Sequence, residues 1–214
     1  MVPTNLVASA TITASSAVLS ANNLKTVGRT EVWRSTGTTA TLTVSFATDE
    51  TIDTVAIMTS NLSAASTWRI RIYNASAVLQ YDSGTNLACP PRDFGSLDWG
   101  YEPLGVNSFA FGMSSQSVLW IPTRYLGRSV VIDIVDATNT SGYLEASRLV
   151  IGERYEPKFN MSDGITLSFE ERGKQARSED GTLRSEQGVK LRNMSFSMDT
   201  FQEADRADIA EISR

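Results

Sequence analysis

The stretch VWRSTGTTATLTVSFATDETIDTVAIMTSNLSAASTWRIRIYN, from Val32 to Asn74, decides the fold of this chain. In residues 40–46, ATLTVSF, apolar residues alternate with small polar ones, which is the period-2 pattern of a half-buried strand. Residues 52–58, IDTVAIM, follow the acidic pair Asp49-Glu50, which we interpret as a turn, and their nearly continuous apolar character predicts an inner strand. Residues 67–73, TWRIRIY, alternate again, so we expect strand, turn, strand, turn, strand.

Three more strand candidates follow: SVLWI at residues 117–121, RSVVIDIVD at residues 128–136 and YLEASRLVIG at residues 143–152. Turn residues separate them, and no convincing helix precedes Asp199. Short strands at this spacing favour an antiparallel sheet over alternating strands and helices. The sequence therefore predicts an all-β fold, an antiparallel β-sandwich of the jelly-roll type.

The composition changes near residues 155–157, from a Ser- and Thr-rich segment to a charged one. We therefore expect a sandwich domain at residues 1–156 and an extension for assembly at residues 157–214. In the extension, Asp180-Gly181 is a typical hairpin turn. The alternation of apolar residues slips around Asn193, which indicates a bulge there.

The last residues, DTFQEADRADIAEISR, predict a C-terminal helix. Thr200 and Glu203, three residues later, match a capping box. An apolar stripe at helical spacing follows, made of Phe201, Ala204, Ile209 and Ile212. The full expectation is thus a jelly-roll sandwich followed by a β-hairpin extension and a C-terminal helix.

The ionisable side chains exclude several classes of function. The net charge is −5, from 19 Lys and Arg against 24 Asp and Glu, and no basic stripe is long enough to follow a phosphate backbone, so we expect no nucleic-acid partner. The sequence has no His, which excludes Ser/His/Asp and Cys/His catalytic arrangements and removes the commonest zinc ligand. Because no phosphate-binding loop or metal cluster stands out either, we expect no enzyme, no catalytic residue, no cofactor and no metal site.

Cys89 is the one cysteine, so it cannot form a disulfide within the chain, and we expect a small, semi-buried apolar residue. The first residues contain no charged region before an apolar core, and no window is apolar enough to span a bilayer. We therefore expect a soluble protein without membrane insertion, folded where it is made.

The loop PPRDFGSLDWGYEPLGVNSFAFG, residues 90–112, is the most suggestive segment for binding. Its aromatic side chains could stack on a sugar ring, or they could anchor a protein interface, where such residues are enriched. The candidate contact residues for glycan or protein are Phe94, Trp99, Tyr101, Phe109 and Phe111. Asp98 and Glu102 could form a glycosidase pair, but two carboxylates four residues apart in a loop are common by chance.

Two further segments each allow two interpretations. In YDSGTN, residues 81–86, side-chain oxygens could bind calcium, but an Asx-type turn between strands explains them better. The charged hairpin at residues 170–186 carries both signs in alternation, which suits a solvated arm. Because an isolated two-stranded ribbon is marginally stable in water, we favour an interface between subunits for this hairpin.

Several short peptides occur in the order typical of one family of jelly rolls. They are an Asn-Leu near the first loop, a Trp-Arg-Ser near the second strand, an alternating strand and an Asn-Leu-Ser turn, here Asn23-Leu24, Trp33-Arg34-Ser35, Leu42-Val44-Phe46 and Asn61-Leu62-Ser63. In these the chain resembles the discoidin-like, galactose-binding-domain family. The resemblance implies a jelly roll with binding loops at one end. The aromatic, basic or calcium-binding residues of such lectins do not align here residue by residue, so no site is carried over.

Residues 61–73, 142–157 and 165–198 also resemble a group of tailed-phage and prophage tail proteins, in which such a sandwich precedes a β-hairpin extension and a helix. This resemblance covers most of the chain. It implies a structural component of a phage tail tip or baseplate, of the distal-tail kind, located in the virion after synthesis in the host cytoplasm. Its implied partners are identical copies in a homo-oligomeric ring and other tail proteins, such as tail tube, hub, tape-measure or fibre components.

A second hypothesis belongs to another class of function. The chain would be a carbohydrate-binding module for glycans of the host cell surface, without a structural role. The aromatic loop would then be the binding site. The two hypotheses differ in the extension, because only the structural one requires residues 157–214 for assembly.

Overall fold

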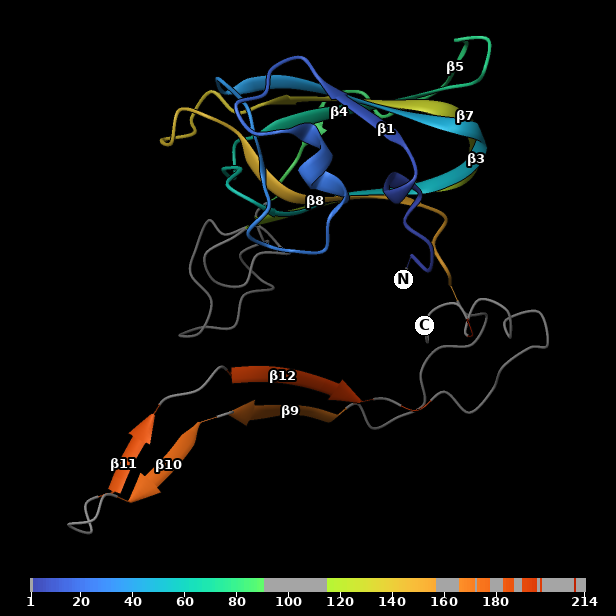
Figure 1. Ribbon diagram of the computed structural model, residues 1–214. Helices are drawn as coiled ribbons and strands as arrows, with labels where there is room; N and C mark the ends of the chain where they lie inside the picture. The colour runs from blue at the N-terminus through green and yellow to red at the C-terminus, as the bar shows by residue number, and fades with distance from the viewer. Residues whose placement is uncertain are drawn as a thin grey trace. The chain divides into compact units, whose positions relative to one another are not determined.

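The computed structural model describes residues 2–90, 115–156, 166–171, 173–177, 183–186, 190–195, 197 and 210. The chain divides into two compact units, Met1–Tyr155 and Glu156–Arg214. Figure 1 shows the strands of the first unit in two stacked layers. The second unit contains paired strands and is described by itself below.

The first unit is built from strands joined in one sheet, and all their pairings are antiparallel. In chain order they are β1 (Thr11–Ala14), β2 (Trp33–Arg34), β3 (Thr39–Ser60), β4 (Thr67–Tyr73), β5 (Leu79–Asp82), β6 (Asn86–Leu87), β7 (Ser115–Val135) and β8 (Glu145–Gly152). Two short 3₁₀ helices, η1 (Leu6–Ala8) and η2 (Ala21–Lys25), precede β2. The predicted all-β antiparallel jelly-roll sandwich is confirmed. Among the described residues, no helix has the length and hydropathy needed to cross a membrane.

Strands β3 and β7 belong to both layers of the sandwich. The first half of β3 pairs with β1 and with residues 129–135 of β7, which in turn pair with β4. The last half of β3 pairs with residues 115–120 of β7 and with β8. Both strands curve over together at the right of Figure 1, so the sheet folds back on itself. The upper layer thus contains β1, β4, β5 and β6, and the lower layer contains β2 and β8.

The turn expected at Asp49-Glu50 is wrong. Strand β3 continues through these residues, and its register with β7 shifts between Ser45 and Glu50. The acidic pair therefore lies in a bend of one long strand. Likewise, the two strands expected at residues 117–121 and 128–136 both belong to β7. A shift of register accommodates such a bend, because extra residues on one strand increase its local curvature.

The core lies between the two layers. The alternation predicted for residues 40–46 and 67–73 is confirmed, because Leu42, Val44, Phe46, Trp68, Ile70 and Ile72 are buried. In the same layer, β7 contributes the buried residues Val130, Ile132 and Ile134. The lower layer contributes Val55, Ile57, Leu149 and Ile151. Residues 52–57 are buried throughout, as expected for an inner strand. Each such large side chain contributes about 1.5–3 kcal/mol relative to exposure in water.

The second unit contains two antiparallel pairs. Strand β9 (Thr166–Glu171) pairs with β12 (Lys190–Ser195), and β10 (Lys174–Arg177) pairs with β11 (Leu183–Glu186) between them in sequence. The register of β12 with β9 runs without a shift from Lys190 to Ser195, so the bulge expected at Asn193 is wrong. The expected turn at residues 180–181 and the expected helix, apart from Ala210, lie outside the described residues.

Candidate functional site

Three connections of the sandwich converge at one end, which we call the loop end: residues 35–38, 61–66 and 136–144. Backbone hydrogen bonds join them to one another and to the strands. Ser35 N donates to Leu144 O (2.9 Å), and Asp136 N donates to Thr38 O (2.9 Å). The loop end lies at the left of Figure 1, opposite the bend of β3 and β7.

A buried carboxylate holds two of these connections together. Asp136 is 1% exposed and follows directly after β7. Its oxygens accept hydrogen bonds from Ser63 N (2.8 Å), Ser63 Oγ (2.5 Å) and Asn139 Nδ2 (3.2 Å). The Thr138 hydroxyl adds a longer contact of 3.3 Å. Hydrogen bonds to an ionised carboxylate are stronger than those between neutral groups, so this cluster makes the loop end rigid.

The side-chain amide of Asn61 also connects segments at the loop end. Its Nδ2 donates to Tyr143 O (2.9 Å) and its Oδ1 accepts from Glu145 N (2.8 Å), so both ends of the amide are used. Asn139 Nδ2 also donates to Asn61 O (3.1 Å). These amides therefore position backbone at the loop end and do not point into solvent as ligands.

A surface group of three side chains stands at the same end. Arg34 at the end of β2 pairs with Glu145 at the start of β8, with Nη2 and Oε2 2.6 Å apart, and its guanidinium lies 4.3 Å above the ring of Tyr143. The hydrogen bond from Arg34 to Glu145 is the main cause that raises the pKa of Arg34. An aromatic ring beside a cation and a carboxylate offers stacking and hydrogen bonds at once, which is the chemistry that recognises polar rings.

The aromatic segment predicted for binding is attached at the loop end. The described chain stops at Pro90 and resumes at Ser115. Ser115 Oγ lies 2.8 Å from Ser60 Oγ, while Cys89 Sγ lies 3.2 Å from Ser117 Oγ and Cys89 is fully buried. The candidate residues Phe94, Trp99, Tyr101, Phe109 and Phe111, with Asp98 and Glu102, lie between these anchors in sequence, outside the described residues. Their roles stay predictions.

Solved structures that resemble the chain include carbohydrate-binding modules. One is chitosan-binding module 1 of a chitosanase/glucanase from Paenibacillus sp. IK-5, with 15% identity, coverage of 70% of this chain and 99% of that one, and a TM-score of 0.48. Another is the family 32 carbohydrate-binding module of C. perfringens NanJ in complex with galactose, with 11% identity, 69% and 97% coverage, and a TM-score of 0.48. A third is the lectin domain of lectinolysin complexed with Lewis B antigen, with 10% identity, 72% and 100% coverage, and a TM-score of 0.48. No protein-family model matches the chain, and no curated protein matches it either.

The short peptides on which the sequence resemblance rests belong to the framework. Trp33 is 1% exposed, and its Nε1 donates to Ser16 O (3.3 Å). Ser35 Oγ accepts from Leu144 N (2.8 Å), and Asn23 Nδ2 donates to Val32 O (2.8 Å). These side chains satisfy buried backbone groups where loops meet strands. They therefore identify the fold and do not identify a ligand.

The Asx-turn interpretation of residues 81–86 is confirmed. Asp82 Oδ1 accepts from Gly84 N (2.9 Å), and Gly84 has a positive φ of 64° that suits glycine. Both carboxylate oxygens of Asp82 also bind Arg69, and the hydrogen bonds from Arg69 are the main cause that lowers the pKa of Asp82 to about 2. Among the described residues, no group of three or more acidic or Cys side chains could hold a metal ion.

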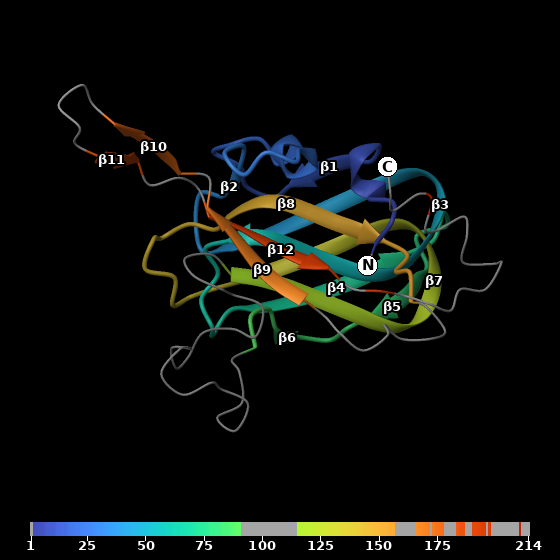
Figure 2. The ribbon, with the colours of Figure 1, turned by 90° about the horizontal axis from the view of Figure 1, so that it is seen from below.

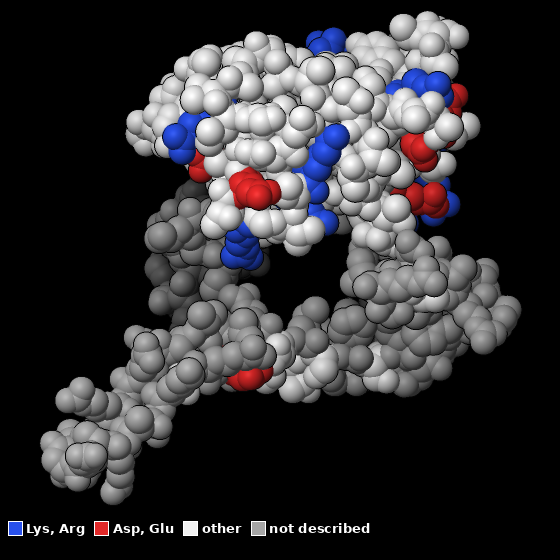
Figure 3. Space-filling view, in the orientation of Figure 1, with Lys and Arg blue, Asp and Glu red and all other residues white. Residues whose placement is uncertain are grey.

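Charged side chains are sparse on the face shown in Figure 3. They occur there in small groups, several of which combine both signs, with wide uncharged areas between them. The sandwich contributes ion pairs such as Arg128 with Asp49 (3.4 Å) at the bend. This face therefore carries no broad area of one sign of charge among the described residues.

Proposed function

We propose that the chain is a non-catalytic carbohydrate-binding protein whose loop end recognises a sugar. One observation carries the proposal: Cys89 and Ser115, on either side of the aromatic segment, lie at the end where Arg34, Tyr143 and Glu145 meet. Five aromatic residues are thereby tethered to the end that carries a ring, a guanidinium and a carboxylate. Stacking on aromatic rings and hydrogen bonds to hydroxyls are the two contacts that sugars require.

The rigidity of the loop end supports the same proposal. The Asp136 cluster and the Asn61 amide hold the connections in one conformation. A binding site on rigid supports loses less entropy when the ligand binds. The jelly roll here thus serves as a frame that presents its end loops.

The proposal is tested by binding to an immobilised panel of oligosaccharides that end in galactose, fucose or glucosamine. We expect the full chain to bind at least one of them. Tyr143→Ala and Trp99→Ala should each weaken that binding about tenfold, because each removes one stacking surface. Leu126→Ala is the matched control, since Leu126 is 63% exposed at the opposite end. Unchanged binding by both Tyr143→Ala and Trp99→Ala, or no binding by the wild type, would refute a sugar site at the loop end.

A second candidate is a structural component of a phage tail tip or baseplate, and the second unit favours it. Its described strands pair only as β9 with β12 and β10 with β11. A two-stranded ribbon is marginally stable alone, so it is expected to need a partner. In this role the chain would lie in the virion and contact identical copies and other tail proteins.

The structural candidate predicts that the extension is needed for incorporation. We expect a chain that lacks residues 161–214 to fold but to be missing from gradient-purified particles, while the full chain is present at a small fixed copy number. Quantitative mass spectrometry of the particles measures both. The sandwich should fold without the extension, because its core lies within the first unit. Normal incorporation of the truncated chain would exclude this role for the extension.

A further inference from the structure

The two outer faces of the sandwich have opposite character. On the outer face of the upper layer, one row of residues that pair across β3, β7 and β4 is polar: Thr41, Asp133 and Arg69. Thr41 Oγ1 donates to Asp133 Oδ1 (2.8 Å), Arg71 also binds Asp133, and Arg69 binds Asp82. The hydrogen-bonding groups of this row are satisfied within the sandwich, as in a sheet that faces water.

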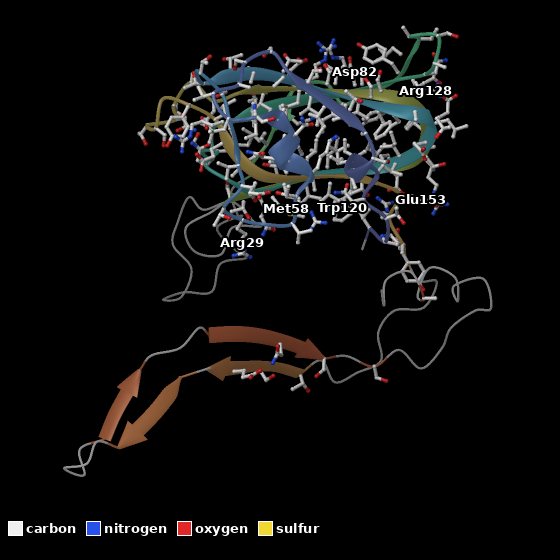
Figure 4. All side chains as sticks on the ribbon, in the orientation of Figure 1. Arg29, Met58, Asp82, Trp120, Arg128 and Glu153 are labelled. Carbon is white, nitrogen blue, oxygen red and sulfur yellow. The ribbon has the colours of Figure 1, made fainter. Side chains whose placement is uncertain are left out.

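The outer face of the lower layer is apolar. Its position follows from the register, because Val55 and Ile57 point into the core and their neighbours Ala56 and Met58 point away. Across the strands, Ala56 pairs with Val118 and Val150, Met58 pairs with Arg148, and Thr54 pairs with Trp120. Ala56 itself is only 1% exposed, so we call the partly or fully exposed set Met58, Val118, Trp120 and Val150 the apolar face. Figure 4 shows Met58 and Trp120 on the same, lower side of the sandwich.

Trp120 is the most exposed member of the apolar face. Half of its surface, 50%, is exposed, whereas Trp33 and Trp68 are at most 3% exposed. Charged residues form a rim beside it: the Arg154 guanidinium lies 5.9 Å from the indole centroid, and Arg124 pairs with Glu153 at 2.6 Å. An apolar centre with an aromatic anchor and a charged rim is the usual anatomy of a protein interface.

The apolar face also borders an edge of β7 beside which the described residues place no strand, here called the free edge. Residues 129–135 of β7 pair on both sides, with β3 and with β4. Residues 115–120 pair with β3, and within the described residues no strand pairs with their other side. Figure 2 views this lower layer from below. A free edge presents unpaired N–H and C=O groups, which readily accept an added strand.

In the second unit, strands β9 and β12 form a ribbon of two strands. In the described residues, β9 and β12 pair only with each other. The described side chains of β9, Thr166, Ser168 and Glu170, are exposed and polar, and the sequence has Leu167 and Phe169 between them. Alternation of this kind is typical of a strand that buries one face.

We infer that the apolar face and the free edge of β7 bind the extension of a second copy of this chain, with a strand of its ribbon added beside residues 115–120. A second copy is the occupant because one chain carries both halves of the contact: an edge beside which the described residues place no strand, and a ribbon of two strands. The two halves differ, so the contact is heterologous, and it closes into a ring or continues as a filament. The inference does not depend on sugar binding at the loop end. It specifies a contact for the structural candidate.

The first test compares Trp120→Glu with Leu126→Glu in the full chain. Both residues are exposed apolar side chains of β7, but Leu126 lies at the bend, away from the apolar face. Sedimentation velocity over a range of concentrations should show association of the wild type and of Leu126→Glu. Trp120→Glu should raise the dissociation constant at least about 30-fold, as for an aromatic interface anchor. A monomeric wild type, or equal association of the two variants, would overturn the inference.

The second test identifies the partner segment and keeps the inference falsifiable if a variant folds poorly. A photo-cross-linking amino acid replaces Met58 in the full chain, and labelled and unlabelled copies are mixed so that contacts between copies can be recognised by mass. Cross-links to residues 157–214 of the other copy would support the inference. Cross-links to another region, or only within one copy, would overturn it. The cross-linking result is independent of the result of the oligosaccharide panel, so the proposed contact between copies and the proposed sugar site can be refuted separately.

Discussion

Replacing Gly127 by valine is expected to destabilise the sandwich by about 3 kcal/mol, at the upper end of the usual cost of overpacking a core. A Cβ at this position would lie 2.4 Å from Ile72 Cγ2 and 3.1 Å from Ile52 Cδ1. Both isoleucines are fully buried, so neither can move aside without disturbing its own neighbours. The bend of β7 therefore needs a residue without a side chain here.

Urea unfolding followed by tryptophan fluorescence measures this effect, since Trp33 and Trp68 are buried in the sandwich. Gly37→Val is the control, because no atom lies within 4 Å of the Cβ position at Gly37. The control should unfold within about 0.5 kcal/mol of the wild type, as for ordinary surface changes. Equal unfolding midpoints for the two valine variants would contradict the close packing at the bend.

Replacing Asp136 by alanine is expected to cost a similar amount, about 3 kcal/mol. The carboxylate is buried and accepts hydrogen bonds from Ser63, Thr138 and Asn139. Without it, the Ser63 N–H loses its acceptor, and a buried donor left unpaired costs about 1–3 kcal/mol. The change should also loosen residues 61–66 and 136–144 and weaken any sugar binding that depends on them.

The control for this substitution is Asp49→Ala. The Asp49 side chain is 46% exposed and lies 3.4 Å from Arg128 at the bend, so its loss should cost less than about 1 kcal/mol. Urea unfolding gives the free energies, and amide hydrogen exchange at Ser63 reports the loop end directly. Slow exchange of that amide in Asp136→Ala would show that other contacts hold the loop.

Much of the fold was predictable because its information is local. Alternation in residues 40–46 and 67–73 requires only that one face be buried, and the structure places these residues as expected. The two-sided burial of residues 52–57 likewise follows from their continuous apolar character. The Asx turn at Asp82 was readable because side chain and backbone partner are two residues apart.

The continuity of β3 could not be read from the sequence. Asp49-Glu50 has the composition of a turn, yet β3 continues because β7 bends beside it, and Glu50 pairs with Gly127, far away in sequence. The bulge expected at Asn193 failed for a related reason. A polar residue interrupts the apolar alternation there, but Asn193 simply pairs with Ser168 in an unbroken register. Alternation in one strand shows which of its faces is apolar. Its register depends on the strand that pairs with it.

The candidate site was only partly predictable. Composition singled out residues 90–112, but the end of the sandwich to which they attach depends on contacts such as Ser60 with Ser115. The group of Arg34, Tyr143 and Glu145 gave no signal, because β2 and β8 are far apart in sequence and only their pairing brings these side chains together. The apolar face could not be predicted from the sequence either, since Trp120 and Val118 have the composition of any strand.

The sharing of β3 and β7 between the two layers has a mechanical consequence. In a sandwich of two separate sheets, force applied to one sheet reaches the other through side-chain contacts and through the loops that connect the sheets. Here the peptide chain itself continues from one layer to the other at the bend. Force applied at the loop end is therefore also carried from one layer to the other along β3 and β7 themselves, which remain paired with each other in both layers.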